Sequence, residues 1–170
     1  LTKAIDNSRL KGATQKLAAV YLDSRIRATQ NNTSYEVLVS PPGIVPAQVC
    51  IDLDGNGVCG ANEPITTFPG QITVGNVGAP VPLDLTVLHY PVHSQMDTLA
   101  PSLAWNSRGL PCQRNSATAA CLNTGWGWVQ HLQMQRSSGE ITYAAVTVSP
   151  TGRVKTWIYI PSGNGNGQWF

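Results

Sequence analysis

A short run of oxygen-bearing side chains is the strongest candidate for chemistry in this sequence. The spacing matches the roughly 12-residue calcium loop, in which ligands stand at alternate positions, a glycine at the sixth and a glutamate at the last. Gly57 occupies the glycine position. Calcium prefers several hard oxygens around a tight turn. The segment therefore predicts a calcium site with these ligands, the valine through its carbonyl: Asp52, Asp54, Asn56, Val58 and Glu63.

The same segment has a second interpretation, a turn without metal. Cys59 stands where a calcium loop usually carries an aliphatic residue, and a bridge from Cys50 would already hold the turn closed. No helical pattern flanks the segment on both sides. Asp, Asn and Gly are also the residues that build tight turns on their own. We favour the turn and keep calcium as the alternative.

The four cysteines form two pairs with the same local spacing. Cys50 is nine positions before Cys59, and Cys112 is nine positions before Cys121. The usual short zinc spacings are absent from the sequence. Of the three possible connectivities, the two local disulfides are the natural one, each adding about 2.5–3 kcal/mol of stability. Disulfides would imply an oxidising compartment; four buried thiols are the alternative.

The first part of the chain predicts one long helix, over residues 3–30. Apolar and small residues recur there at steps of three and four. They form one stripe: Ile5, Leu10, Ala13, Leu17, Val20, Tyr21, Ser24 and Ala28. The pair Asn31-Asn32 should end the helix, because Asn tolerates the left-handed backbone conformation of a C-cap. Such a stripe needs a partner surface from the rest of the chain.

The rest of the chain predicts a β domain. Gly and Pro total 28 residues, and charged residues make up 12% of the chain, as is typical of a loop-rich β domain. Short strands are expected at 35–39, 48–53, 65–68, 71–74, 83–89, 102–106, 127–135, 142–149 and 153–160. The last three should form an antiparallel meander. The tail 162–170 should be flexible, although Trp169 and Phe170 could fold back. The expected class is α+β, a helix packed on a mainly antiparallel sheet.

Four segments, in order along the chain, together resemble one known protein family. The first is the helix end Leu17–Asn32, LAAVYLDSRIRATQNN, and the second is Val49–Ile65, VCIDLDGNGVCGANEPI. The third is Leu103–Pro111, LAWNSRGLP, and the fourth is the closing hairpin Ala145–Lys155, AVTVSPTGRVK. These segments are similar to those of the GspH/FimT family of minor pseudopilins and pilins. Gly-centred hairpins are common, so the order of the four segments makes the resemblance more specific than any one of them.

The resemblance implies a pilin-like head domain over residues 1–170. Residues 1–31 would be the C-terminal half of the pilin helix, 34–161 the β domain and 162–170 the tail. The function would be structural and not enzymatic: a subunit of a type II secretion pseudopilus or a type IV pilus, partnered by other pseudopilins or minor pilins. Family members anchor in the inner membrane through an apolar helix of about 20 residues. No run of that kind occurs here, so we expect such a segment upstream of Leu1. The localisation implied is periplasmic.

Two further functions are weighed beside this one. Some members of the resembled family bind DNA through a Gly-Arg-x-Arg motif, which Arg153 and Lys155 match except for the final Lys. Both would lie on one strand face and could contact phosphates, with Lys the weaker substitute for a bidentate Arg. Two solvated basic residues are the simpler interpretation, and the net charge of only +2 favours it. The third possibility is an exported carbohydrate- or calcium-binding module.

Overall fold

The computed structural model describes residues 2–75, 82, 92–94, 102–114, 120–122, 124–136, 138–160 and 167–170. Within these residues, one α-helix is followed by β-strands that form two six-stranded sheets. The predicted α+β class, a helix packed on β-structure, is confirmed. The strands divide into two sheets, however, where the sequence predicted one.

Helix α1 spans Thr2–Gln30, as the periodicity predicted. It ends through the backbone of Asn32, which has a φ of 49°. The N–H of Thr33 then reaches the carbonyl of Ala28 at 3.1 Å, the closing hydrogen bond of a Schellman motif. The predicted Asn cap is therefore confirmed.

The buried face of α1 follows most of the predicted stripe. Its fully buried residues are Leu10, Ala13, Thr14, Leu17, Tyr21, Ser24 and Ala28. The prediction is wrong at Ile5, whose side chain is 46% exposed, and Val20 is only half-buried. Ile5 precedes the first buried position, Leu10, so it lies ahead of the part of the helix that reaches the core.

The first sheet, sheet A, has the order β3-β2-β1-β6-β7-β8, and all its neighbours are antiparallel. Its strands are β1 (Tyr35–Val39), β2 (Gln48–Asp52), β3 (Ile65–Thr67), β6 (Leu103–Trp105), β7 (Pro111–Arg114) and β8 (Cys121–Leu122). The sequence predicted β1, β2, β3 and β6 to within a residue. It missed β7 and β8, which are short and carry the second cysteine pair.

The second sheet, sheet B, contains the predicted meander β9-β10-β11, which is confirmed. Its strands are β4 (Ile72–Val74), β5 (Val92–Ser94), β9 (Gly127–Gln135), β10 (Ile141–Val148), β11 (Val154–Ile160) and β12 (Gln168–Trp169). The order is β12-β11-β10-β9-β4, and β5 pairs with β9 in parallel. The strand predicted at 83–89 lies outside the described residues.

The C-terminus differs in part from the flexible tail that was expected. Residues 161–166 lie outside the described residues, but Gln168–Trp169 pairs with β11. Trp169 is 9% exposed and packs against Tyr159 and His131. The alternative expectation, that Trp169 folds back onto the domain, is thus confirmed.

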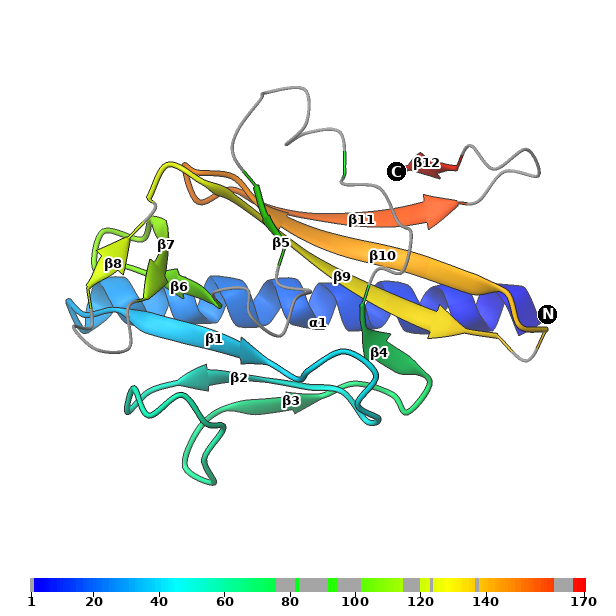
Figure 1. Ribbon diagram of the computed structural model, residues 1–170, viewed down its shortest axis with the longest axis horizontal. Helices are drawn as coiled ribbons and strands as arrows, with labels where there is room; N and C mark the ends of the chain where they lie inside the picture. The colour runs from blue at the N-terminus through cyan, green and yellow to red at the C-terminus, as the bar shows by residue number, and fades with distance from the viewer. Residues whose placement is uncertain are drawn as a thin grey trace.

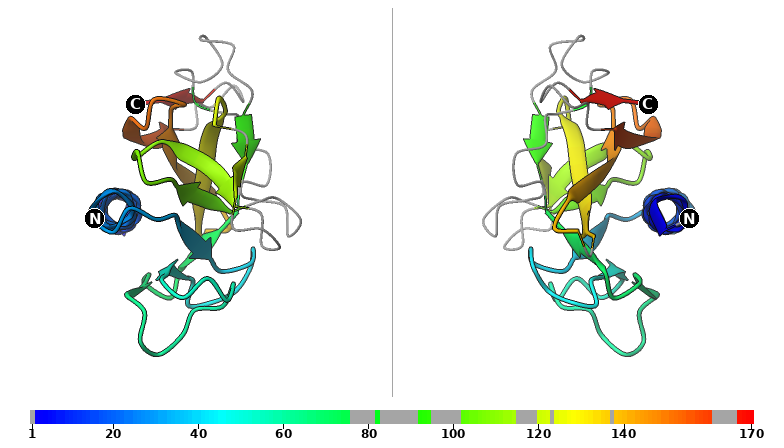
Figure 2. Two further views of the ribbon diagram at one scale, coloured as in Figure 1. Left: turned by 90° about the vertical axis from the view of Figure 1, so that its left-hand side faces the viewer. Right: turned by 90° about the vertical axis from the view of Figure 1, so that its right-hand side faces the viewer.

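Helix α1 runs along the length of the molecule and crosses both sheets (Figure 1). Seen end-on, it lies to one side of them (Figure 2). One core cluster joins Leu17 of the helix to Val37 and Trp105 of sheet A and to Leu132 and Val146 of sheet B. Among the described residues, α1 is the element that both sheets share, and no helix has the length and apolar character needed to cross a membrane.

Both predicted local disulfides are present. Cys50 is bonded to Cys59 and Cys112 to Cys121, with Cα separations of 5.8 and 5.3 Å. The bridge at Cys50 closes the loop after β2, and the bridge at Cys112 joins β7 to β8. Such bonds persist in oxidising compartments, so they indicate an extracytoplasmic environment.

Candidate functional site

The loop between β2 and β3 begins at Asp52, the last residue of β2. The Asp52 side chain is buried, and both of its oxygens accept backbone hydrogen bonds. Oδ1 accepts the N–H of Gly55 at 2.6 Å and Oδ2 the N–H of Gly57 at 2.9 Å. The carboxylate therefore forms the centre around which the chain turns, the role that turn chemistry gives to Asp.

The next polar residues of the loop bond to one another. Asp54 accepts both the backbone N–H and the side-chain Nδ2 of Asn56, at 3.1 and 2.8 Å. The Oδ1 of Asn56 in turn accepts the N–H of Val58 at 2.7 Å. Val58 itself is 64% exposed. These are successive Asx turns, which need no ion.

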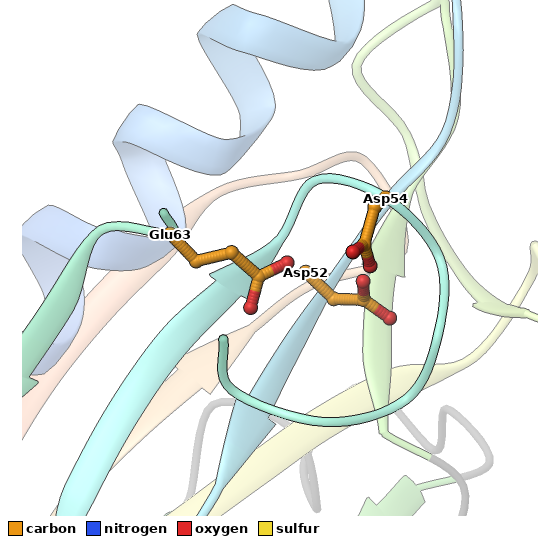
Figure 3. A group of neighbouring side chains, drawn as sticks. All are labelled: Asp52, Asp54 and Glu63. Atoms are coloured by element: carbon orange, nitrogen blue, oxygen red, sulfur yellow. The ribbon is translucent and has the colours of Figure 1, made fainter. Parts of the chain in front are cut away.

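Glu63 closes the loop from its far end. Its Oε1 accepts the N–H of Leu53 at 2.7 Å and its Oε2 the N–H of Gly60 at 2.8 Å. The carboxylates of Asp52, Asp54 and Glu63 point toward one another from three parts of the loop (Figure 3). One oxygen from each lies within 4.8 Å of the other two. Among the described residues, this is the one group of acidic, His or Cys side chains close enough to share a metal ion.

The structure thus brings together three of the five predicted calcium ligands. Three carboxylates are the ligand type that calcium prefers. Each oxygen of Asp52 and Glu63 already accepts an N–H, so an ion would have to use their remaining lone pairs. The geometry explains the loop fully as a turn, and calcium stays a prediction.

Arg114 faces this loop from β7. Its Nη1 lies 3.8 Å from Oδ2 of Asp52, and the two side chains are 15% and 0% exposed. Gly55 has a φ of 76°, and a Cβ there would overlap the Arg114 guanidinium. A fixed cation therefore already lies against the most buried carboxylate of the group, where it would compete with a metal ion.

Glu36 completes the same cluster from β1, where it is paired with Asp52 across the sheet. Burial raises the pKa of the Glu36 carboxyl, and the neighbouring Asp52 raises it further. A hydrogen bond with Ser102 and the Arg114 charge lower this pKa, and the net direction is upward. Sequence reasoning missed Glu36 and Arg114, because only strand pairing brings them to the loop.

A second polar cluster lies where α1 ends. Arg25 donates from Nη1 to the carbonyl of Gly152 at 2.8 Å, and its Cζ lies 5.5 Å from the ring centroid of the buried Trp105. A Cβ on Gly109 would lie 3.1 Å from Nε of Arg25 and 3.1 Å from Cγ2 of Thr29. Three of the four segments that carry the family resemblance meet here: the helix end, the segment after β6 and the β10–β11 hairpin.

The two basic residues of that hairpin make different contacts. Arg153 is exposed just before β11, and its backbone N–H donates to Oγ of Ser149 at 3.1 Å. Lys155 is half-buried on β11, with Nζ 3.9 Å from the ring centroid of Trp157. A cation–π contact engages the lysine charge within the protein. DNA binding through Arg153 and Lys155 stays a prediction.

Comparison of the chain with models of protein families, with curated proteins and with solved structures found no match.

Proposed function

We propose that this chain is the extracytoplasmic head of a structural fibre subunit, of the minor pseudopilin or pilin kind, which associates with other subunits and catalyses no reaction. The four resembling segments, the two disulfides and the long N-terminal helix packed across β-structure support this proposal. The fibre would be a type II secretion pseudopilus or a type IV pilus, held at the inner membrane by a segment upstream of Leu1.

The observation that carries the proposal is the outward face of α1. Opposite the buried stripe runs a second row of residues with alternating steps of three and four. It contains no charge, and we call it the outward stripe: Ile5, Ser8, Gly12, Gln15, Ala19, Leu22, Ile26 and Thr29. Apart from the half-buried Gly12, all are exposed, and Leu22 and Ile26 are 44% and 52% exposed. This spacing is that of the seam between two packed helices.

A helix face that only meets water would be expected to carry charges. Here the charged side chains flank the outward stripe instead, as Arg9, Lys11, Lys16 and Asp23. No described element covers this side of the helix (Figure 2). Folding of the head does not require an uncharged outward stripe with exposed Leu22 and Ile26, so we take it as the surface that packs against another subunit.

The test expresses two Leu→Glu variants in the cell from which the protein comes and compares how much of each enters the fibre. The two leucines have nearly equal exposure in the head. Leu22 on the outward stripe is 44% exposed, and Leu122 on β8 is 45% exposed. Leu22→Glu should reduce the amount of subunit recovered with sheared fibres about tenfold, because a charge buried without a partner costs more than about 1.4 kcal/mol. Leu122→Glu should leave recovery unchanged, and both variants should unfold at the parent's temperature.

Equal recovery of the two variants would contradict the proposal. The proposal would also be contradicted if the coding region upstream of Leu1 encoded a cleavable secretory signal instead of a leader and an apolar anchor. That second result would favour a free exported module.

A further inference from the structure

Strand β3 forms one edge of sheet A. Within the described residues it pairs only with β2, in the register Gln48↔Thr67, Val49↔Thr66 and Cys50↔Ile65. The flanking bonds are Ile51 N–H to the Pro64 carbonyl at 3.3 Å and Phe68 N–H to the Ala47 carbonyl at 2.9 Å. Hydrogen-bonded pairs alternate along an antiparallel ladder, so Thr66 points its backbone groups toward β2.

The same alternation turns the backbone groups of Ile65 and Thr67 away from β2. These two residues therefore present N–H and C=O groups at the outer edge, in the pattern that another strand recognises. Both side chains are exposed, Ile65 by 42%. Natural edge strands usually carry a charge or an internal proline that discourages pairing, and Ile65-Thr66-Thr67 has neither. Pro64 and Pro69 bracket the strand, so they limit an added strand to a short pairing.

A groove of about 340 Å³ opens beside this edge, between α1 and sheet A. Ala19 and Val20 line it from the helix, and Ile51 of β2, Thr66 of β3 and the preceding Pro64 line it from sheet A. The lining is mainly apolar. A strand added to β3 would direct every second side chain to the helix side of the sheet, where the groove lies.

The charges at the rim of the groove favour an acidic partner. Lys16 and Asp23 both line it from the helix. The carboxylate of Asp23 is engaged by Nε of Arg27 at 2.9 Å. Lys16 is exposed, and no ion pair of it occurs within the described residues. The charge left to attract a ligand is therefore positive.

We propose that β3 and this groove bind an extended segment of another protein, which adds a strand to sheet A. The segment carries small or β-branched apolar side chains at alternate positions and an acidic residue that reaches Lys16. Main-chain hydrogen bonds to Ile65 and Thr67 supply affinity and the groove supplies specificity. This inference goes beyond the fibre proposal and stands without it, because it depends on the edge of β3. Ala19 belongs to both the groove and the outward stripe, but the main-chain pairing to Ile65 and Thr67 does not involve the stripe.

The test uses a library of random dodecapeptides displayed on phage as the probe and the intact oxidised chain as bait. Thr67→Pro removes an outward N–H without removing a bond to β2, and Thr67→Val keeps that N–H. Peptides enriched on the parent should alternate apolar residues and contain Asp or Glu. As synthetic peptides they should bind Thr67→Pro about tenfold more weakly than the parent or Thr67→Val, since Thr67→Pro removes one main-chain hydrogen bond and tenfold corresponds to about 1.4 kcal/mol.

A second variant and a second measurement keep the test independent of folding defects. Lys16→Glu changes an exposed side chain and should reverse the preference from acidic to basic peptides. Hydrogen exchange of the Ile65 and Thr67 amides should be fast in the free chain and slow with peptide bound. The proposal is overturned if no peptide is enriched on the parent over Thr67→Pro, or if bound peptides leave both amides unprotected.

Discussion

The side chain of Arg25 lies between the helix and two turns that are distant in the sequence. It donates to the carbonyl of Gly152 and covers the ring of Trp105. Gly152 belongs to the Gly-Arg-x-Lys segment for which DNA contact is one hypothesis. In the structure this glycine has a packing role that needs no ligand.

Gly152→Ala should destabilise the protein strongly. The residue has a φ of 83°, and a Cβ would lie 3.0 Å from the Gly109 carbonyl oxygen and 3.2 Å from the Trp105 ring. The left-handed backbone costs an L-residue about 1–2 kcal/mol, and overpacking costs about 1–3 kcal/mol more. We expect the free energy of unfolding in urea to fall by about 2–5 kcal/mol.

Gly43→Ala is the matched control for this substitution. Gly43 has nearly the same φ, 82°, but nothing lies within 4 Å of the added Cβ. Gly43→Ala should therefore lower the free energy of unfolding only by the cost of the left-handed backbone, about 1–2 kcal/mol. If both substitutions lowered the free energy of unfolding equally, the close packing around Gly152 would contribute nothing to the effect of Gly152→Ala.

Glu36, which is paired with Asp52 across sheet A, should make the folding stability depend on pH. Its folded pKa is raised above the ordinary value of 4.5, first by burial and then by Asp52. The folded protein therefore binds more protons than the unfolded one just above pH 4.5, so this residue lowers stability as pH rises through that window. Glu36→Gln should raise the unfolding temperature at pH 7, and the gain should disappear below pH 4. A gain that persists unchanged in acid would contradict this account of the cluster.

At the scale of elements, the loop between β2 and β3 is organised by buried oxygens. Asp52→Ala should lower the free energy of unfolding by about 2–4 kcal/mol in EDTA, because two backbone N–H groups lose their acceptor inside the loop. Urea unfolding of the oxidised protein measures this loss.

Asp54→Ala tests the same loop at an exposed carboxylate. Within the part of the chain that the structure describes, Asp54 accepts hydrogen bonds from Asn56 alone. Removal of the Asp54 carboxylate should therefore lower the free energy of unfolding by less than about 1 kcal/mol in EDTA. If both substitutions are neutral in EDTA and costly only with excess calcium, the loop is a calcium site and the turn interpretation is wrong.

The elements that the sequence predicted are those whose signal is local. The spacing from Leu10 to Ala28 shows one helix face, and three β-prone runs separated by short Gly-containing turns show the meander of β9, β10 and β11, because each pattern comes from neighbouring residues. The division into two sheets depends on which distant strands pair. Arg114 of β7 reaches Asp52 of β2 only when β1 and β6 have paired between these two strands. No spacing along the chain encodes that contact.

At the scale of the whole molecule, α1 holds the two sheets together and is fixed to them near both ends. Arg25 joins its last turns to Trp105 of sheet A and to the β10–β11 hairpin. Near its beginning, residues 4–9 include no buried side chain. There the helix depends on polar contacts: Arg9 to Gln71 at 3.0 Å, and Asp6 and Asn7 to Arg136.

Arg136 should therefore control the order of the first helical turns. Its guanidinium is 8% exposed and donates to Oδ1 of Asn7 at 2.7 Å and to Glu140 at 2.8 Å, with Asp6 at 3.9 Å. Charged hydrogen bonds of this kind contribute about 1.5–3 kcal/mol, so Arg136→Met should speed hydrogen exchange of helix amides 6–10 by about tenfold or more. Arg9→Met, which removes an exposed contact, should have a smaller effect, and the amides of Leu17 and Tyr21 should not change in either variant. If exchange at 6–10 were unaffected, the first turns would be held by helix propensity alone, and the direction in which α1 leaves the head would not be fixed by sheet B.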